Sequence, residues 1–313
     1  MKLKLIVAMC KGNGIGFHNS IPWNIKKDLL YFSNKTTGTY GTHLKNIQKG
    51  IVNTSAIVDK KVKKNAIIMG KNTWLSLPKY PAPLKNRDNI ILSSTIPESI
   101  THRFDSFFEN NFDLTIHLSS ISRVIDFCMF PSSVLVGESK IYELFEKHEM
   151  LQMREINRNS MIQNNKSTYD DVWIIGGSQI YGIFIHANMK KEINVLINDF
   201  YITYIDKYYE CDTFFPSIEN MNLYYISSFS MYENIDENSG LRVPVYYIVF
   251  TRMEYENDSH SHSDGSTKNI QIKYIEHEDK GKYYYYYYAT KCGNCDFITS
   301  ENIASFMWCV TAC

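Results

Sequence analysis

Short apolar runs that alternate with segments of helical spacing constrain the fold of this chain most. The runs end in a glycine or serine loop, or close to one: Leu3–Met9, Asn65–Met69, Asp88–Ser94 and Val172–Gly177. Such runs are typical of parallel strands that are covered on both faces. A further strand ends near Ile205, and Tyr225–Tyr232 is expected to pair with Pro244–Arg252 as an antiparallel hairpin. The pattern predicts an α/β fold with a mostly parallel sheet.

Two polar stretches interrupt this pattern, at about residues 37–64 and 131–170. The first follows a helix that is predicted to run from an Asn24 cap through Lys35, and it shows no apolar period. The second is expected to contain one helix, Lys140–Met153, and then a polar linker. We interpret both stretches as surface insertions in a domain of residues 1–254.

The charge balance bounds the partners of the chain. Lys plus Arg and Asp plus Glu both number 33, which argues against a general nucleic-acid or anionic-membrane binder. The apolar N-terminal run ends at Cys10, too early for a signal peptide, and no run has the length of a transmembrane helix. Seven scattered cysteines do not form a disulfide framework. These features predict a soluble, cytoplasmic protein with reduced thiols.

The residues after 254 differ in character from the rest. A polar linker leads to six consecutive tyrosines, Tyr283–Tyr288, and to a cysteine-containing end. The pairs Cys292/Cys295 and Cys309/Cys313 do not have the spacing of a zinc ribbon, so no metal site is predicted. We expect residues 255–313 to be a low-complexity linker and tail of unknown role.

The stretch Ile15–Phe32 combines a glycine-containing loop, a Pro-Trp corner and one acid among apolar residues. Pro22 restricts the backbone, so the Trp23 ring is presented in a defined direction. Asp28 and Phe32 are four residues apart and share one helix face. An acid there can hold a proton or bind a protonated heterocycle through two parallel hydrogen bonds. A solvent-facing acid stabilised by the helix dipole is the alternative, and spacing alone leaves both open.

Three strand ends carry residues suited to a dinucleotide. Free amides after Gly70 can bind phosphate, although an ordinary strand-to-helix turn has the same pattern. Ser93 and Ser94, with Lys71, suit a 2′-phosphate, which favours NADPH over NADH. Gly176–Gly177 permits a close approach of backbone to a cofactor, but the three-glycine Rossmann fingerprint is absent.

The pattern I-G-x4-I-P-W-x4-D-x3-F-x3-T, from Ile15 to Thr36, resembles the signature of the dihydrofolate reductase family. Further blocks follow in the order of that family: N-A-I-I-M-G-K-N-T-W-L-S-L-P, N-R-D-N-I-I-L-S-S, I-I-G-G-S-Q-I-Y and Y-I-T-Y-I-D-x4-C-D-T-F-F-P. The resemblance covers roughly residues 3–254 apart from the two insertions. It implies a dihydrofolate reductase-like fold, with an eight-stranded, mainly parallel sheet, flanking helices and a C-terminal antiparallel hairpin.

The resemblance also implies an activity, the NADPH-dependent reduction of 7,8-dihydrofolate to 5,6,7,8-tetrahydrofolate. The implied catalytic residues are Asp28, which binds the pterin and promotes its protonation, Thr203, which orients Asp28, and Trp23, which holds a water. Arg87 matches the arginine that binds the glutamate α-carboxylate of folate. The full set implied for the substrate is Val7, Ala8, Asp28, Leu29, Phe32, Leu77, Leu84, Arg87, Ile175 and Thr203.

The cofactor site implied by the resemblance includes a cis peptide between Gly176 and Gly177. An arginine is usual in the family at the position of Lys71, which keeps the charge and loses the bidentate fork. The loop from Gly12 to Asn24 is expected to act as a lid. The residues implied for NADPH are Ala8, Ile15, Gly16, Ser20, Gly70, Lys71, Asn72, Thr73, Leu92, Ser93, Ser94, Ile175, Gly176, Gly177, Ser178, Gln179, Ile180 and Tyr181.

The expected partners are dihydrofolate and antifolate-like small molecules, and the expected state is a monomer or weak oligomer. A pyrimidine reductase of riboflavin synthesis shares the fold but is not expected to carry P-W-x4-D. A non-catalytic binding or scaffold relative would show a decayed active site, and no decay is visible. Some relatives are fused to thymidylate synthase, but the residues after 254 are too few for a synthase.

Overall fold

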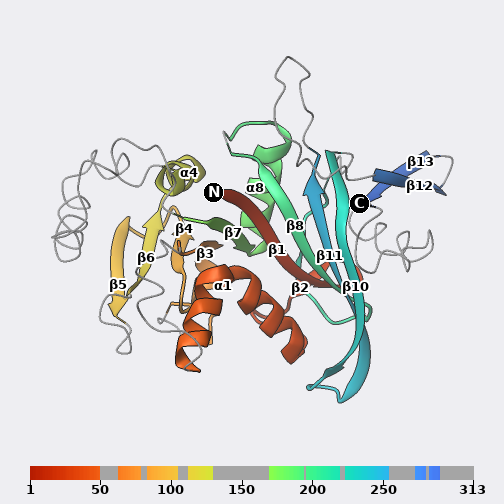
Figure 1. Ribbon diagram of the computed structural model, residues 1–313, viewed down its shortest axis with the longest axis horizontal. Helices are drawn as coiled ribbons and strands as arrows, with labels where there is room; N and C mark the ends of the chain where they lie inside the picture. Colours follow the sequence, from red (N-terminus) through yellow and green to blue (C-terminus); the bar gives the residue numbers. More distant parts are fainter. Residues whose placement is uncertain are drawn as a thin grey trace. The chain divides into compact units, whose positions relative to one another are not determined.

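The computed structural model describes residues 1–49, 63–78, 83–104, 112–129, 169–193, 195–218, 223–253, 272–279 and 282–289 (Figure 1). The chain divides into two compact units. The first contains Met1–Leu5 and Lys26–Leu196, and the second contains Ile6–Ile25 and Ile197–Cys313. Strand β1, Lys2–Cys10, begins in the first unit and ends in the second.

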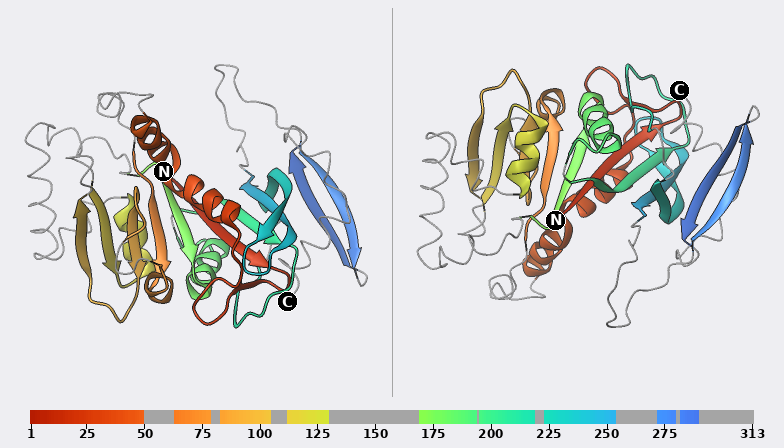
Figure 2. Two further views of the ribbon diagram at one scale, coloured as in Figure 1. Left: turned by 90° about the horizontal axis from the view of Figure 1, so that it is seen from below. Right: turned by 90° about the horizontal axis from the view of Figure 1, so that it is seen from above.

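The sheet of the first unit has the strand order β1-β7-β3-β4-β6-β5 (Figures 1 and 2). All neighbours are parallel except β5 and β6, which are antiparallel. Strands β3 and β4 are buried almost throughout, which explains why their sequences are apolar runs without alternation. The bounds are β7 Asp171–Gly176, β3 Ala66–Gly70, β4 Asp88–Leu92, β6 Phe112–Leu118 and β5 Ser99–Phe104.

Four helices of this unit lie within the described residues, and they follow the strands along the chain. Their bounds are α1 Lys26–Gln48, α3 Lys71–Leu75, α4 Ile121–Met129 and α8 Ser178–Met189. Helices α4 and α8 follow β6 and β7, in agreement with the expected alternation of strands and helices. None of these helices combines the length and the hydropathy that a membrane crossing requires.

Helix α1 corrects the prediction that the first helix ends at Lys35. The helix instead continues to Gln48 across a kink at Gly38, where φ is 58° and ψ is −147°. The hydroxyls of Thr36 and Thr37 bond to carbonyl oxygens four residues earlier, at 2.8 Å each. Tyr40, beyond the kink, is buried. The sequence concealed this continuation because its polar residues and glycines mask the helical period, whereas burial of Tyr40 stabilises the second part.

The second unit is antiparallel in its main hairpin. Its strand order is β1-β8-β11-β10-β13-β12, with β8 Ile197–Ile205, β11 Leu241–Arg252 and β10 Tyr224–Asp236. Ile226 pairs with Phe250 and Tyr232 with Val245, so the predicted hairpin is confirmed. A small separate sheet joins β2, Gly14–Gly16, to β9, Thr213–Phe214.

The predicted fold is confirmed in its eight strands, which are β1, β3, β4, β6, β7, β8, β10 and β11. Five strands of the sheets were not predicted, namely β5, β12 and β13 of the large sheet and the short strands β2 and β9. Strand β5 extends the edge of the first unit, and the tail forms a hairpin of β12, Ile272–Asp279, and β13, Lys282–Ala289. Strand β13 pairs in parallel with β10 through Ile226 and Tyr288. The predicted helix Lys140–Met153 and the four tail cysteines lie outside the described residues.

Candidate active site

Asp28 lies in the first turn of α1 and only 6% of its surface is exposed. This burial excludes the solvent-facing alternative that spacing left open. Its neighbour Leu29 is an exposed apolar residue, 51% accessible, and Phe32 on the next turn is half-buried. A buried carboxylate next to accessible apolar side chains suits a flat heterocycle with a polar edge.

Arg87 is a buried cation just before β4, with 5% of its surface exposed. Its Nε donates to the Lys85 carbonyl at 3.1 Å and its Nη1 donates to the Thr36 hydroxyl. The guanidinium carbon lies 5.7 Å from the centre of the Phe32 ring. Burial lowers the pKa of Arg87 to about 10, although the charge of Asp113 opposes this shift.

No carboxylate of the described residues forms an ion pair with Arg87. A buried guanidinium without such a partner is costly, and a ligand carboxylate supplies the missing charge. Two further predicted substrate residues, Leu77 and Leu84, are half-buried in the same unit. These features agree with the predicted role of Arg87 in binding the far end of the substrate.

Two glycines predicted for the cofactor site lie close to side chains of neighbouring elements. A Cβ added at Gly70 would lie 2.8 Å from the Ile180 side chain, and one at Gly177 would lie 3.2 Å from the Thr73 hydroxyl. The N-termini of α3 and α8 therefore lie next to each other. Each of these helices has glycine as its N-cap and no side-chain cap, so backbone amides are left for a phosphate.

Lys71 lies beside the hydroxyls that the sequence pointed to. Its Nζ donates to the Thr95 hydroxyl at 3.1 Å, and the hydroxyls of Ser93 and Thr95 are 3.2 Å apart. Lys71 and Ser94 are exposed, whereas Leu92, two residues before Ser94, is buried. An accessible ammonium among hydroxyls is a suitable site for a phosphate monoester.

The peptide between Gly176 and Gly177 is cis, as the resemblance implied. Gly176 has φ of 105°, and a Cβ on it would lie 2.8 Å from the Tyr181 ring. The Tyr181 amide donates to the Gly177 carbonyl at 3.0 Å, in the first turn of α8. Ile180 and Tyr181 are buried and hold this turn, while Gln179 is exposed and Ser178 half-buried.

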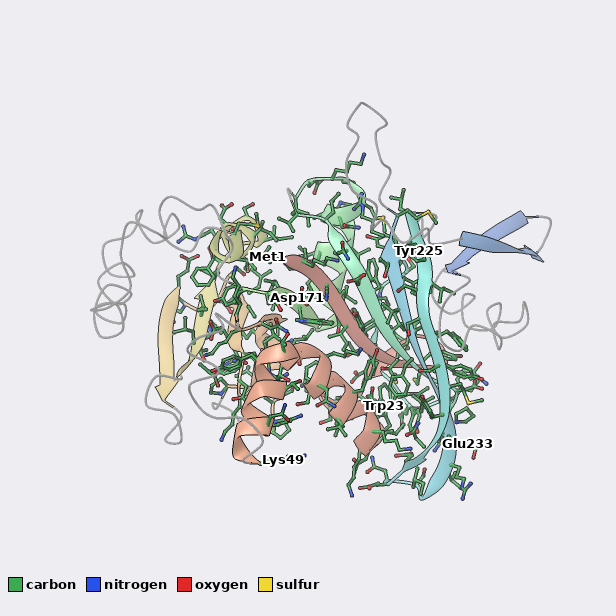
Figure 3. All side chains as sticks on the ribbon, viewed as in Figure 1. Met1, Trp23, Lys49, Asp171, Tyr225 and Glu233 are labelled. Atoms are coloured by element: carbon green, nitrogen blue, oxygen red, sulfur yellow. The ribbon has the colours of Figure 1, made fainter. Side chains whose placement is uncertain are left out.

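Trp23 is buried in the second unit, near the turn that joins β10 and β11 (Figure 3). Within the described part of the chain its indole nitrogen is buried and has no hydrogen-bond partner. The centroids of the Trp23 and Tyr209 rings lie 5.5 Å apart, and the two ring planes are tilted by 60°. A buried N–H donor without a protein acceptor suits an ordered water, which is the predicted role of Trp23.

The loop after β1 is held by a short turn and by β9. The amides and carbonyls of Phe17 and Ser20 exchange hydrogen bonds of 2.9 and 3.0 Å, and His18 and Asn19 between them have positive φ. The Asp212 amide donates to the Gly16 carbonyl, and the Asp212 carboxylate accepts from the His18 amide at 2.8 Å. Ile15 and Gly16 are half-buried and Ser20 is exposed.

The remaining predicted residues are placed on central strands. Val7 and Thr203 are buried on β1 and β8, and Ala8 is half-buried beside Val7. Ile175 is half-buried on β7 of the first unit. Asp28 and Thr203 belong to different units, so the hydrogen bond expected between them stays a prediction.

Comparison with known sequences decides the family. A sequence model of the family described as dihydrofolate reductase matches residues 2–41 and 132–252, more than half of the chain. The chain belongs to the dihydrofolate reductase family.

Among similar proteins, the dihydrofolate reductase of Heliothis virescens is 29% identical over 227 residues, which cover 72% of this chain and 85% of that protein. The dihydrofolate reductase of Drosophila melanogaster is 27% identical over 77% of this chain and 94% of that protein. A bifunctional dihydrofolate reductase-thymidylate synthase of Arabidopsis thaliana is 26% identical over 87% of this chain, but only 35% of that protein. The likeness to the single-function reductases therefore extends over nearly their whole length.

Within this dihydrofolate reductase fold, the sequence did not point to the residues that hold the Pro22–Asn24 corner. Asp236, 1% exposed at the end of β10, accepts from the Asn24 amide at 3.0 Å and from the Tyr209 hydroxyl at 3.0 Å. The Glu237 amide donates to the Asn24 carbonyl at 2.9 Å. Asn24, the partner of Asp236 and Glu237 in this corner, lies more than 200 residues away from them in the sequence.

Proposed function

We propose that this chain reduces 7,8-dihydrofolate to 5,6,7,8-tetrahydrofolate with NADPH, and so supplies one-carbon metabolism and thymidylate synthesis. The observation that carries the proposal is Asp28, a buried acid in a complete I-P-W-x4-D-x3-F motif of this family. The alternative activities do not require an acid at this place.

Asp28 binds the amino-pyrimidine edge of the pterin through two parallel hydrogen bonds. The negative charge of Asp28 favours the protonated form of the heterocycle, and the proton reaches the pterin N5 through water. Thr203 orients the carboxylate, and Leu29, Phe32 and Leu77 form the walls of the site. Arg87 receives the glutamate α-carboxylate of the substrate.

NADPH supplies the hydride when it is bound. The amides of Lys71–Thr73 and of the first turn of α8 hold its phosphates. Lys71 and the hydroxyls of Ser93 and Ser94 bind the 2′-phosphate. The Lys71 ammonium contacts the hydroxyl of Thr95 at 3.1 Å, and that hydroxyl lies 3.2 Å from the Ser93 hydroxyl, which supports the assignment.

The loop Gly12–Asn24 covers the reacting atoms and excludes bulk water. Trp23 fixes the one water that carries the proton, since its buried indole N–H has no acceptor among the described residues.

We further propose that the chain acts in the cytoplasm as a monomer or weak oligomer and binds antifolates, and that residues 1–254 form the reductase domain. Light scattering of the purified chain tests the oligomeric state.

The decisive experiment follows NADPH oxidation with and without dihydrofolate. We expect oxidation only when both are present. Asp28→Asn is expected to lower the rate of hydride transfer near neutral pH by about 10²–10⁴-fold, the usual contribution of a general acid. Asp126→Asn, which changes an exposed acid of α4, is the matched control and should leave the rate unchanged. An Asp28→Asn variant with an unchanged rate and pH profile would refute the assignment.

The cofactor assignment has a separate test. Lys71→Ala should lower kcat/KM for NADPH roughly tenfold, since one charge-assisted contact to phosphate is lost, and leave kcat/KM for NADH unchanged. Lys71→Arg, which restores the residue usual in the family, should keep the preference for NADPH. Equal losses with both cofactors would show that Lys71 does not contact the 2′-phosphate.

A further inference from the structure

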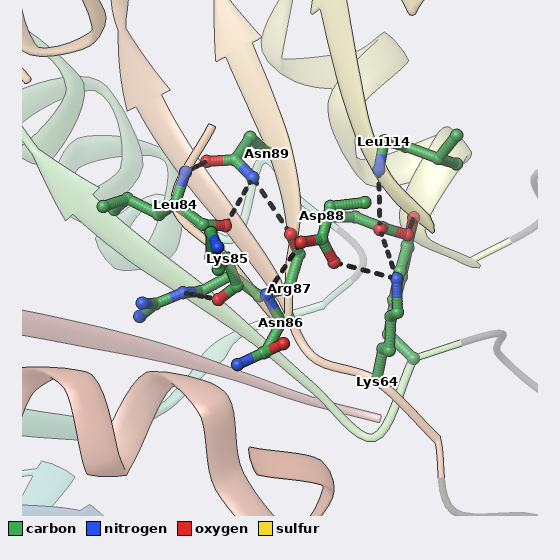
Figure 4. A network of polar contacts seen from close by, with 10 residues as sticks. Lys64, Leu84, Lys85, Asn86, Arg87, Asp88, Asn89 and Leu114 are labelled. Atoms are coloured by element: carbon green, nitrogen blue, oxygen red, sulfur yellow. Dashed lines mark hydrogen bonds and ion pairs between the residues drawn. The ribbon is translucent and has the colours of Figure 1, made fainter. Parts of the chain in front are cut away.

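The loop Leu84–Arg87 that presents the guanidinium is closed by Asn89, a fully buried residue of β4 (Figure 4). The Asn89 Oδ1 accepts from the Leu84 amide at 3.0 Å. Its Nδ2 donates to the Leu84 carbonyl at 3.1 Å and to the Arg87 carbonyl at 2.9 Å. One amide side chain therefore fixes both ends of the loop.

Asp113, on β6, fixes the middle of the same loop. Its Oδ2 accepts from the Asn86 amide at 2.8 Å, where Asn86 has an unusual φ of 64°. Its Oδ1 accepts from the Lys64 ammonium at 3.0 Å. Lys64 also lies 3.4 Å from Asp88, whose carboxylate accepts from the Leu114 amide at 3.0 Å (Figure 4).

The two oxygens of Asp113 are thus each bound by a donor other than Arg87. Asp113 still acts on Arg87 through its charge, since it raises the pKa of a guanidinium whose pKa burial lowers. No ion pair within 4.0 Å joins the two side chains, both of which are described. Asp113 therefore stabilises the cation and fixes its loop without occupying its hydrogen-bond fork.

We propose that Asp113 is a positioning residue that keeps Arg87 available for a carboxylate-bearing pterin. In this role Asp113 determines the preference of the enzyme for substrates with a glutamate tail over pterins that lack one. The proposal rests on the proposed function, because it takes Arg87 as the residue that receives the substrate carboxylate. Lys64 and Asn86 contribute by holding Asp113 away from Arg87.

Two substrates separate this role from a merely structural one. The test measures kcat and KM for dihydrofolate and for 6-methyl-7,8-dihydropterin, which lacks the benzoylglutamate. Asp113→Ala should raise KM for dihydrofolate about tenfold, because Arg87 is no longer held in position for the substrate carboxylate, with little change in kcat. The values for the truncated pterin should not change. Asp113→Asn keeps an acceptor for the Asn86 amide and should raise KM only about threefold.

Asp126→Asn is the control for a lost acid in the same unit. A double-mutant cycle adds a second measurement that depends on Arg87. In an Arg87→Ala background, Asp113→Asn should have no further effect on KM for dihydrofolate. This cycle remains informative if Asp113→Ala does not fold.

Three results would overturn the proposal: equal losses on both substrates, no change on either, or full additivity in the Arg87→Ala background. Failure of the proposed function looks different. In that case the unaltered chain would not oxidise NADPH in the presence of dihydrofolate, and no comparison of KM values would arise.

Discussion

Each unit of the molecule contains a polar cluster around a buried carboxylate. The two clusters differ in the groups that stabilise the buried negative charge. In the first unit, the Lys64 cluster consists of Lys64, Asp88, Asp113 and Tyr169, and one ammonium lies between two carboxylates at 3.4 and 3.0 Å. In the second unit, the Asp236 cluster consists of Asp236, Lys207, Tyr209 and Ser239. Its single carboxylate accepts from two hydroxyls, at 3.0 and 2.7 Å, and lies 3.4 Å from an ammonium.

The pKa values of the two acids shift in opposite directions. Burial raises the pKa of Asp88, and the charge of Lys64 only partly offsets this effect. Burial also acts to raise the pKa of Asp236, but hydrogen bonds from the Asn24 amide, the Ser239 hydroxyl and the Tyr209 hydroxyl outweigh it and lower the pKa to about 2. Hydrogen bonds from several donors therefore favour the ionised form of Asp236, whereas burial dominates at Asp88.

The difference in the number of donors also predicts how much stability each cluster loses when one donor is removed. The Lys64 cluster depends on one ammonium, whose own pKa is raised by Asp88 and Asp113 despite burial. The Asp236 cluster spreads its interactions over several donors, so the loss of any one of them is tolerated better. The first cluster supports the Arg87 loop, and the second holds the corner that carries Trp23.

The largest effect is expected from Lys64→Met. This variant leaves two buried carboxylates without their ammonium, so the free energy of unfolding in urea should fall by about 3–5 kcal/mol. Lys63→Met, which changes the exposed neighbouring lysine, should alter it by less than about 0.5 kcal/mol. Similar small losses for both variants would mean that the cluster does not depend on Lys64.

Asp236→Asn should have the next largest effect, a loss of about 2–3 kcal/mol in the free energy of unfolding. The amide cannot accept all the donors that converge on the carboxylate, and some of them become unsatisfied. Glu233→Gln is the matched control, since this acid lies on the same strand and its side chain is 60% exposed. If Asp236→Asn were as harmless as the control, the several donors would contribute nothing to stability.

Tyr209→Phe removes one donor of the Asp236 cluster and keeps the ring that contacts Trp23. The expected loss is about 1 kcal/mol, because the remaining donors still satisfy the carboxylate. Tyr208→Phe, at a residue that is 77% exposed, is the control. Chemical denaturation measures the loss. A loss as large as that of Asp236→Asn would contradict the idea of shared donors.

The smallest expected effect is a change in how the free energy of unfolding depends on pH, and this dependence appears only in acid. The folded-state pKa of Asp236 is about 2, below its usual value of 3.8, so its stabilisation is complete above about pH 4 and is lost as the pH falls towards 2. Asp236→Asn should therefore show a shallower loss of stability across this window than Glu233→Gln. The raised pKa of Asp88 acts in the opposite direction, because its protonation favours the folded state. Thermal unfolding measured from pH 5 to pH 2 provides the comparison.

Sequence alone predicted the strands β3, β4 and β7 because parallel strands covered on both faces are apolar without interruption. It failed for the second part of α1, where glycines and polar residues conceal a helix that continues past Gly38. It also missed β5 and the tail hairpin, whose sequences lack the uninterrupted aliphatic runs of the parallel strands.

The sequence by itself determined the motif of Asp28, the Pro-Trp corner and the glycines at the strand ends, because these depend on local spacing and on backbone freedom. Only the tertiary structure decided that Asp28 is buried and that Arg87 has no ion-pair partner among the described residues. Only the structure showed the hydrogen bonds from the Asn24 amide to Asp236 and from the Asn86 amide to Asp113. These contacts link residues from 27 to more than 200 positions apart. Local spacing cannot encode them, because the packing of the sheets, and not the neighbouring sequence, brings each acid to its donors.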